Sequence, residues 1–173
     1  MQGIQVNLSV LLPNLIKAAT GTNKIDQTLL LLLVYLCDWH SCVKYECRLT
    51  DIAWKVSRHG LSDVGLESFI RSNGDKFIID DVRQEVCYTG NQIPNIEDQP
   101  RQIIDKVLAI NKSYPYSGLA TFVLSTYPIL SSSSYTLEDV DLLKKADEYR
   151  TIITHENTDK HSENTNTVTI GQK

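Results

Sequence analysis

The sequence lacks the motifs that assign many enzymes to a reaction class. Its 8 glycines among 173 residues are scattered at turns, and none forms a glycine-rich loop followed by lysine that could cradle a phosphate. It contains neither a Gly-x-Ser-x-Gly nucleophile motif nor a His-Glu-x-x-His zinc motif. These absences argue against nucleotide hydrolysis, serine hydrolysis and zinc proteolysis. We therefore expect a protein that is not an enzyme, with no catalytic residue and no cofactor.

The chain also lacks an apolar run long enough to cross a membrane. Its longest run, Leu29 to Cys37, stops at Asp38 and is far shorter than the ~20 residues that a membrane span requires. The first residues carry neither the basic segment nor the small-residue cleavage site of a signal peptide. We therefore expect a cytoplasmic protein without membrane contact.

An excess of positive charge is missing as well. The chain has 17 Lys and Arg against 21 Asp and Glu, which gives a formal net charge of −4. Proteins that bind nucleic acid through its phosphates need a surplus of positive charge. The composition therefore favours neither nucleic acid nor an anionic membrane surface as a partner.

The cysteines do not form a metal-binding pattern. Cys37, Cys42 and Cys47 share one predicted helix with His40, and Cys87 lies apart. Structural zinc sites favour ligand pairs on turns, where thiolates can converge on one ion. At 100° per residue, Cys42 lies about 140° around the helix from Cys37, so one helix cannot surround an ion with these side chains. We expect reduced thiols and no metal site.

Helical spacing of apolar residues dominates the sequence that is present. The central prediction is a helix from about Lys24 to Glu46, apolar on nearly all sides between Leu29 and Cys37 and therefore buried. Further helices are predicted over 7–19 with a stop at Gly21, over 98–110, over 118–126, and from a Thr136-Leu-Glu-Asp139 capping box to Tyr149. Residues 1–153 are predicted to form a single helical domain. The tail 154–173 has no aromatic residue and is rich in polar residues, so it is predicted to be disordered.

The segment 50–89 has the pattern of a winged helix. A helix over Thr50–Arg58, a turn at His59-Gly60 and a second helix over Ser62–Arg71 precede two apolar-alternating strands, at 77–79 and 86–88. The predicted fold is therefore mainly α with a small β-hairpin. In it, a winged-helix-like segment packs on the central buried helix and on the C-terminal helices.

The charges of this segment favour protein over DNA as its partner. Between Arg48 and Glu85 there are six Lys or Arg against seven Asp or Glu, and the second predicted helix carries two acids and one base on one face. An aromatic residue beside basic residues has the composition of a binding hot spot. We predict a partner-binding surface made of Trp54, Lys55, Arg58, His59, Asp63, Glu67 and Arg71. A winged-helix DNA-binding regulator that uses Ser62 to Arg71 stays open as the alternative.

Part of the chain resembles a known family. The run Leu31-Leu-Leu-Val-Tyr-Leu-Cys-Asp-Trp-His40, followed by Trp54-Lys and His59-Gly60, resembles the Panacea domain of SocA-like antitoxins. The later run Ile104-Asp-Lys-Val-Leu108, followed by Leu119, is similar to the downstream helix pair of that family. The resemblance covers roughly residues 10 to 125.

A looser resemblance concerns the C-terminal part. The ending Leu142-Leu143 to Tyr149-Arg150 is similar to the middle components of ABC-three-component and Lamassu-like anti-phage systems, which act beside an SMC-type ATPase. Both resemblances imply a non-enzymatic protein of a prokaryotic conflict system. They imply a protein partner encoded by a neighbouring gene, either a toxin or an SMC-like ATPase or effector. Self-association of the chain stays open.

Overall fold

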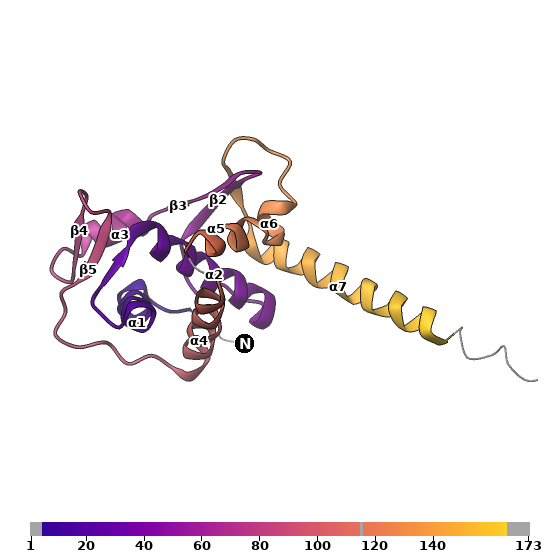
Figure 1. Ribbon diagram of the computed structural model, residues 1–173, viewed down its shortest axis with the longest axis horizontal. Coiled ribbons are helices and arrows are strands. Elements are labelled where there is room, and N and C mark those ends of the chain that lie inside the picture. The colour runs from indigo at the N-terminus through magenta and orange to yellow at the C-terminus, as the bar shows by residue number, and fades with distance from the viewer. Residues whose placement is uncertain (1–4, 115, 166–173) are drawn as a thin grey trace, which may run out of the picture.

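The computed structural model of the protein describes residues 5–114 and 116–165 (Figure 1). The helices are α1 (Leu8–Thr20), α2 (Gln27–Tyr45), α3 (Leu66–Ser72), α4 (Asp98–Ser113), α5 (Tyr116–Leu124), α6 (Tyr127–Leu130) and α7 (Leu142–Thr165). The strands are β1 (Lys24–Asp26), β2 (Ala53–Ser57), β3 (Gly60–Val64), β4 (Phe77–Asp80), β5 (Glu85–Tyr88) and β6 (Glu138–Val140). The prediction of a mainly α fold with a small β part is confirmed. Within the described ranges, no helix is both long and apolar enough to cross a lipid bilayer.

Helix α2 is the centre of the core, as predicted, and packs against α1, α4, α5 and α7. Every side chain from Leu32 to Trp39 is buried. The helix begins three residues later than predicted, because the Asp26 carboxylate accepts a hydrogen bond from the Leu29 amide (2.9 Å) and so fixes the first turn. Residues 24–26 form β1 instead.

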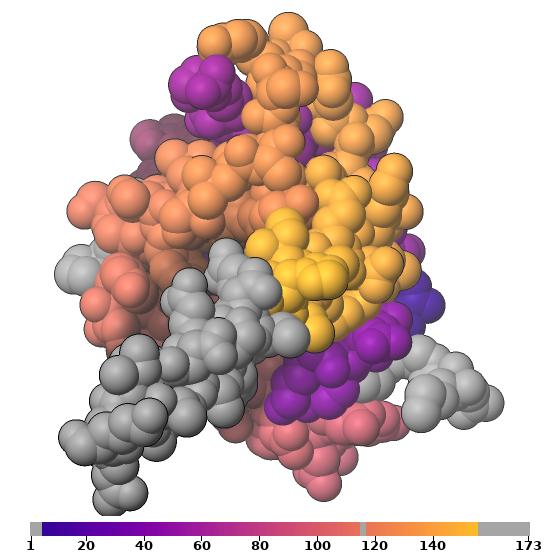
Figure 2. Space-filling view, turned by 90° about the vertical axis from the view of Figure 1, so that its right-hand side faces the viewer, coloured from indigo at the N-terminus to yellow at the C-terminus, as the bar shows by residue number. Residues whose placement is uncertain are grey.

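The far end of α2 is held by α7. The Arg150 guanidinium donates to the carbonyl oxygens of Cys42 (2.8 Å) and Val43 (3.3 Å). These carbonyls belong to the last turn of α2, where a positive charge is favourable. In Figure 2 the yellow part of α7 lies directly above the purple end of α2. Beyond this contact α7 projects away from the body of the molecule (Figure 1).

The strands form two antiparallel sheets, ordered β1-β5-β4 and β3-β2-β6. The first contains the predicted hairpin, in which Phe77 pairs with Tyr88 and Ile79 with Val86. In the second, Trp54 pairs with Asp63 on one side and with Val140 on the other.

The helix-turn-helix predicted over 50–71 is wrong. Residues 53–57 and 60–64 form the hairpin β2–β3, although the chain does turn close to the predicted His59-Gly60 position. Burial favours Trp54 and Val56 on one face of β2, a spacing of two that suits a strand. Of the second predicted helix, only residues 66–71 are helical, and they belong to α3 (Leu66–Ser72). The described chain therefore holds no helix spanning 62–71, on which the DNA-binding alternative depended.

The C-terminal prediction also changes. The last two residues of the predicted capping box, Glu138 and Asp139, belong to β6 instead. Asp141 caps α7 by accepting from the amides of Leu143 (3.0 Å) and Lys144 (3.2 Å). The sequence predicts disorder over 154–173, whereas α7 continues to Thr165. Residues 166–173 lie outside the described residues.

A buried carboxylate joins α2 to β2. Asp38 is fully buried and accepts hydrogen bonds from the Thr50 amide (2.7 Å), the Thr50 hydroxyl (2.6 Å) and the Trp54 indole Nε1 (2.7 Å). Burial raises the pKa of Asp38, and the hydrogen bonds from Thr50 and Trp54 only partly offset that rise. The Trp54 ring also packs edge-on against Tyr35 of α2, with 5.4 Å between centroids. These contacts fix the entry into the second sheet.

Substitution of Asp38 tests this link. Asp38→Ala leaves three buried donor groups without their acceptor. At about 1–3 kcal/mol for each buried group left unpaired, we expect the free energy of unfolding, measured by urea denaturation, to fall by roughly 3 kcal/mol or more. The matched control is Asp51→Ala, an exposed acid in the loop between α2 and β2. Equal effects of the two substitutions would show that Asp38 does not stabilise the fold in this way.

Candidate partner-binding site

The structure separates the residues that were predicted to form one surface. Trp54 is 2% exposed, and its indole N–H donates a hydrogen bond to Asp38. It therefore belongs to the core and leaves no ring surface for a partner. Lys55 is half-buried on β2 and lies 3.8 Å from the Asp139 carboxylate of β6. Both residues therefore act within the second sheet.

Arg58 and His59 lie at the tip of the β2–β3 hairpin and are exposed. The Arg58 guanidinium donates to the Tyr135 hydroxyl (3.1 Å), and the rings of His59 and Tyr135 are 5.7 Å apart. The Arg58 amide also donates to the Ser134 carbonyl (2.8 Å), which holds the loop 131–137 against the tip. Tyr135 was missed from the sequence, because a tyrosine after four serines shows nothing of a hairpin 77 residues earlier.

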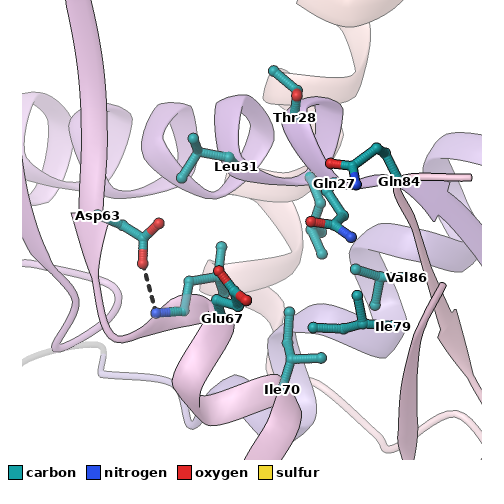
Figure 3. Close-up of a pocket in the computed structure, with 11 residues that line it drawn as sticks. Gln27, Thr28, Leu31, Asp63, Glu67, Ile70, Ile79, Gln84 and Val86 are labelled. Atoms are coloured by element: carbon teal, nitrogen blue, oxygen red, sulfur yellow. Dashed lines mark hydrogen bonds between the residues drawn. The ribbon is translucent and has the colours of Figure 1, made fainter. Parts of the chain in front are cut away.

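Asp63 and Glu67 line a pocket of about 200 Å³ between α2, α3 and the β4–β5 hairpin (Figure 3). Asp63 comes from the end of β3, and Glu67 comes from the first turn of α3. The apolar part of the wall consists of Leu30, Leu31, Leu66, Ile70, Ile79 and Val86. The polar part adds Gln27, Thr28 and Gln84. The pocket wall thus combines apolar and polar side chains and is acidic on one side.

The carboxylates are held in place from within the fold. One Asp63 oxygen accepts from the Leu66 amide (2.6 Å), so Asp63 caps the first amide of α3 from two residues before the N-cap residue Gly65. The other Asp63 oxygen has no hydrogen bond in the described chain. Glu67 accepts from Arg71 Nε (2.8 Å), and Arg71 also donates to Asp81 (2.8 Å). Arg71 therefore orients Glu67 beside the pocket and ties α3 to the β4–β5 turn.

A polar atom in the pocket wall has no partner. The side-chain Nε2 of Gln27 is buried and makes no hydrogen bond to any described residue. The backbone amide of Gln27, by contrast, donates to the carbonyl of Gln84 (2.8 Å), a turn residue with φ of 55°. Because a buried donor without an acceptor costs free energy, a ligand that supplies an acceptor at this point gains affinity. Gln27 carries no sequence signal for this role, since the pocket exists only after the β4–β5 turn has packed on α2.

The arrangement suits a basic side chain. Two carboxylates on one side of an apolar pocket fit a Lys or Arg, whose methylenes pack on the wall while the cationic group meets the acids. Among the described residues, no three His, Cys, Asp or Glu side chains are grouped so as to hold a metal.

A search of family models, curated proteins and solved structures finds no match to this chain.

The cap on α3 can be tested apart from the charge. Asp63→Ala removes the acceptor of the Leu66 amide, so we expect it to lower the free energy of unfolding by about 1 kcal/mol. Asp63→Asn keeps a side-chain oxygen at the cap and should cost much less in the same urea titration. Equal loss in both variants would mean that the charge of Asp63, and not its hydrogen bond, stabilises α3.

Proposed function

We propose that the protein is a non-enzymatic binding component of a prokaryotic conflict system that holds and regulates a protein partner. The observation that carries this proposal is the pocket between α2, α3 and β4–β5, with its two carboxylates, the apolar part of its wall and the unpaired side-chain Nε2 of Gln27. Each feature has a complement in one stretch of peptide. A Lys or Arg side chain would pair with the two carboxylates and pack its methylenes on the apolar part of the wall. A main-chain carbonyl beside it would accept a hydrogen bond from Gln27 Nε2.

The size of the pocket supports a partner side chain over a free small molecule. Its volume of about 200 Å³ is smaller than the roughly 300–1,000 Å³ typical of small-molecule sites. A single anchoring side chain in a pocket, surrounded by flatter contacts, is the usual form of a protein–protein hot spot. The pocket therefore fits as the anchor point of a larger interface.

The hairpin tip offers a second contact area of suitable composition. Arg58 stacks on Tyr135 with 5.6 Å between the guanidinium carbon and the ring centroid, and Tyr135 is 72% exposed. Arg and Tyr are among the residues most enriched in hot spots. Leu130 and Leu137, at either end of the same loop, are also exposed. We propose that a partner docked at the pocket also contacts this tip.

The resemblances of residues 31–40 and 142–150 suggest the class of partner. The first favours an antitoxin-like role toward a toxin, and the second favours a middle component beside an SMC-type ATPase. In either case we propose that the partner is encoded by a neighbouring gene and presents a basic side chain to Asp63 and Glu67.

The test is co-purification of the protein with the products of its neighbouring genes, followed by calorimetric titration of the pair. The double variant Asp63→Asn/Glu67→Gln keeps the α3 cap and an acceptor for Arg71 while removing both charges. We expect its affinity for the partner to fall by about tenfold or more, because each charge-assisted hydrogen bond contributes about 1.5–3 kcal/mol.

The matched control for this experiment is Glu97→Gln, an exposed acid before α4 and outside both proposed contact areas, which should bind the partner as the unchanged protein does. A partner that binds the double variant and the control equally well would rule out the pocket as the anchor. A protein that copurifies with no neighbour-encoded product, and runs as a lone species on light scattering, would rule out the proposed function.

A further inference from the structure

A separate groove lies between α2 and α4. Its cavity has a volume of about 620 Å³. Its principal lining residues are His40, Val43 and Lys44 of α2 and Ile103, Asp105 and Lys106 of α4. A smaller cavity of about 200 Å³ shares His40 and Val43 with it and extends to Trp39, Phe122 and Tyr149. The two cavities therefore adjoin at His40 and Val43, and the wall of the smaller one is mostly apolar and aromatic.

Besides His40 and Gln102, the polar residues that line the groove are two lysines and one acid. The Nε2 atom of His40 is buried and has no hydrogen-bond partner among the described residues. Burial lowers the pKa of His40, and the nearby charges of Lys106 and Lys44 lower it further. The imidazole is therefore neutral near pH 7. Asp105 is the one acid among the lining residues, and in the described chain it forms no ion pair with either lysine.

We propose that this groove binds a small amphipathic carboxylate, with its apolar body along Val43 and Ile103 and its carboxylate at His40 and the two lysines. The combined hollow falls in the range of small-molecule sites, which are typically apolar with a few placed polar groups. This inference does not rest on the proposed partner, which docks on a different set of residues.

The electrostatics select among amphipathic ligands. A carboxylate accepts from His40 Nε2 in the neutral tautomer that carries its proton there, and it gains from the charges of Lys44 and Lys106. A neutral alcohol of the same chain length gains little from those charges, and an amine is repelled by them. The apolar body contributes equally in all three, at about 0.8 kcal/mol for each buried methylene. Ligands that share one chain length therefore isolate the head-group preference.

The experiment titrates the full chain with octanoate, 1-octanol and octylamine, using calorimetry. We expect saturable binding of one octanoate, with 1-octanol and octylamine weaker by about tenfold. The variant Lys44→Met/Lys106→Met should weaken octanoate by about fivefold or more while leaving 1-octanol unchanged, since methionine keeps the apolar stem of lysine.

The control is Lys112→Met, an exposed lysine in the last turn of α4 that does not line the groove. It should bind octanoate as the unchanged protein does. His40→Phe, which keeps a ring but removes Nε2, should weaken octanoate selectively. Absence of saturable octanoate binding, equal affinity for octanoate and 1-octanol, or an equal effect of Lys112→Met would overturn the proposal.

Discussion

The structure depends on the buried Asp38 carboxylate. Burial of a carboxylate is costly unless its lone pairs are satisfied, and here Thr50 and Trp54 supply three donors. Those donors come from the loop and strand that follow α2, so the carboxylate determines where the second sheet begins. Strand β2 then positions β3 as its neighbour, and the end of β3 places Asp63 beside α3. The candidate site thus takes its position from a core contact that lies outside the pocket.

Local signals in the sequence were sufficient for the elements whose contacts are local. The α1 helix and its stop, the central helix and the β4–β5 hairpin were predicted because caps, helical spacing and alternation act within a few residues. The β2–β3 hairpin was not predicted, because Ile52, Ala53 and Val56 also fit a helical spacing. The conformation of these residues is decided by the strand pairing of Trp54 with Val140, far along the chain, and by the hydrogen bond from Trp54 to Asp38. Such long-range terms override local preference.

The candidate site was predicted in part, and for a mistaken reason. Asp63, Glu67 and Arg71 were grouped as one face of a helix, whereas Asp63 lies on β3 and the other two on α3. They still lie together, because Asp63 caps the helix that carries Glu67. Gln27 and His40 could not be found in the same way. Each of them matters because one of its side-chain nitrogens is buried without a hydrogen-bond partner. Whether a side-chain atom is buried depends on elements that lie far away in the sequence.

Helix α2 relates the two hollows to each other. Its N-terminal residues Gln27 and Leu31 form part of the acidic pocket, and His40 and Val43 near its other end form part of the basic groove. Because the helix between them is buried from Leu32 to Trp39, the spacing of the two sites is fixed by a rigid element. The lining residues of the two sites carry opposite charges, so an anion is repelled from one and drawn to the other. The proposed basic partner segment and the proposed carboxylate ligand would therefore use different residues of one molecule.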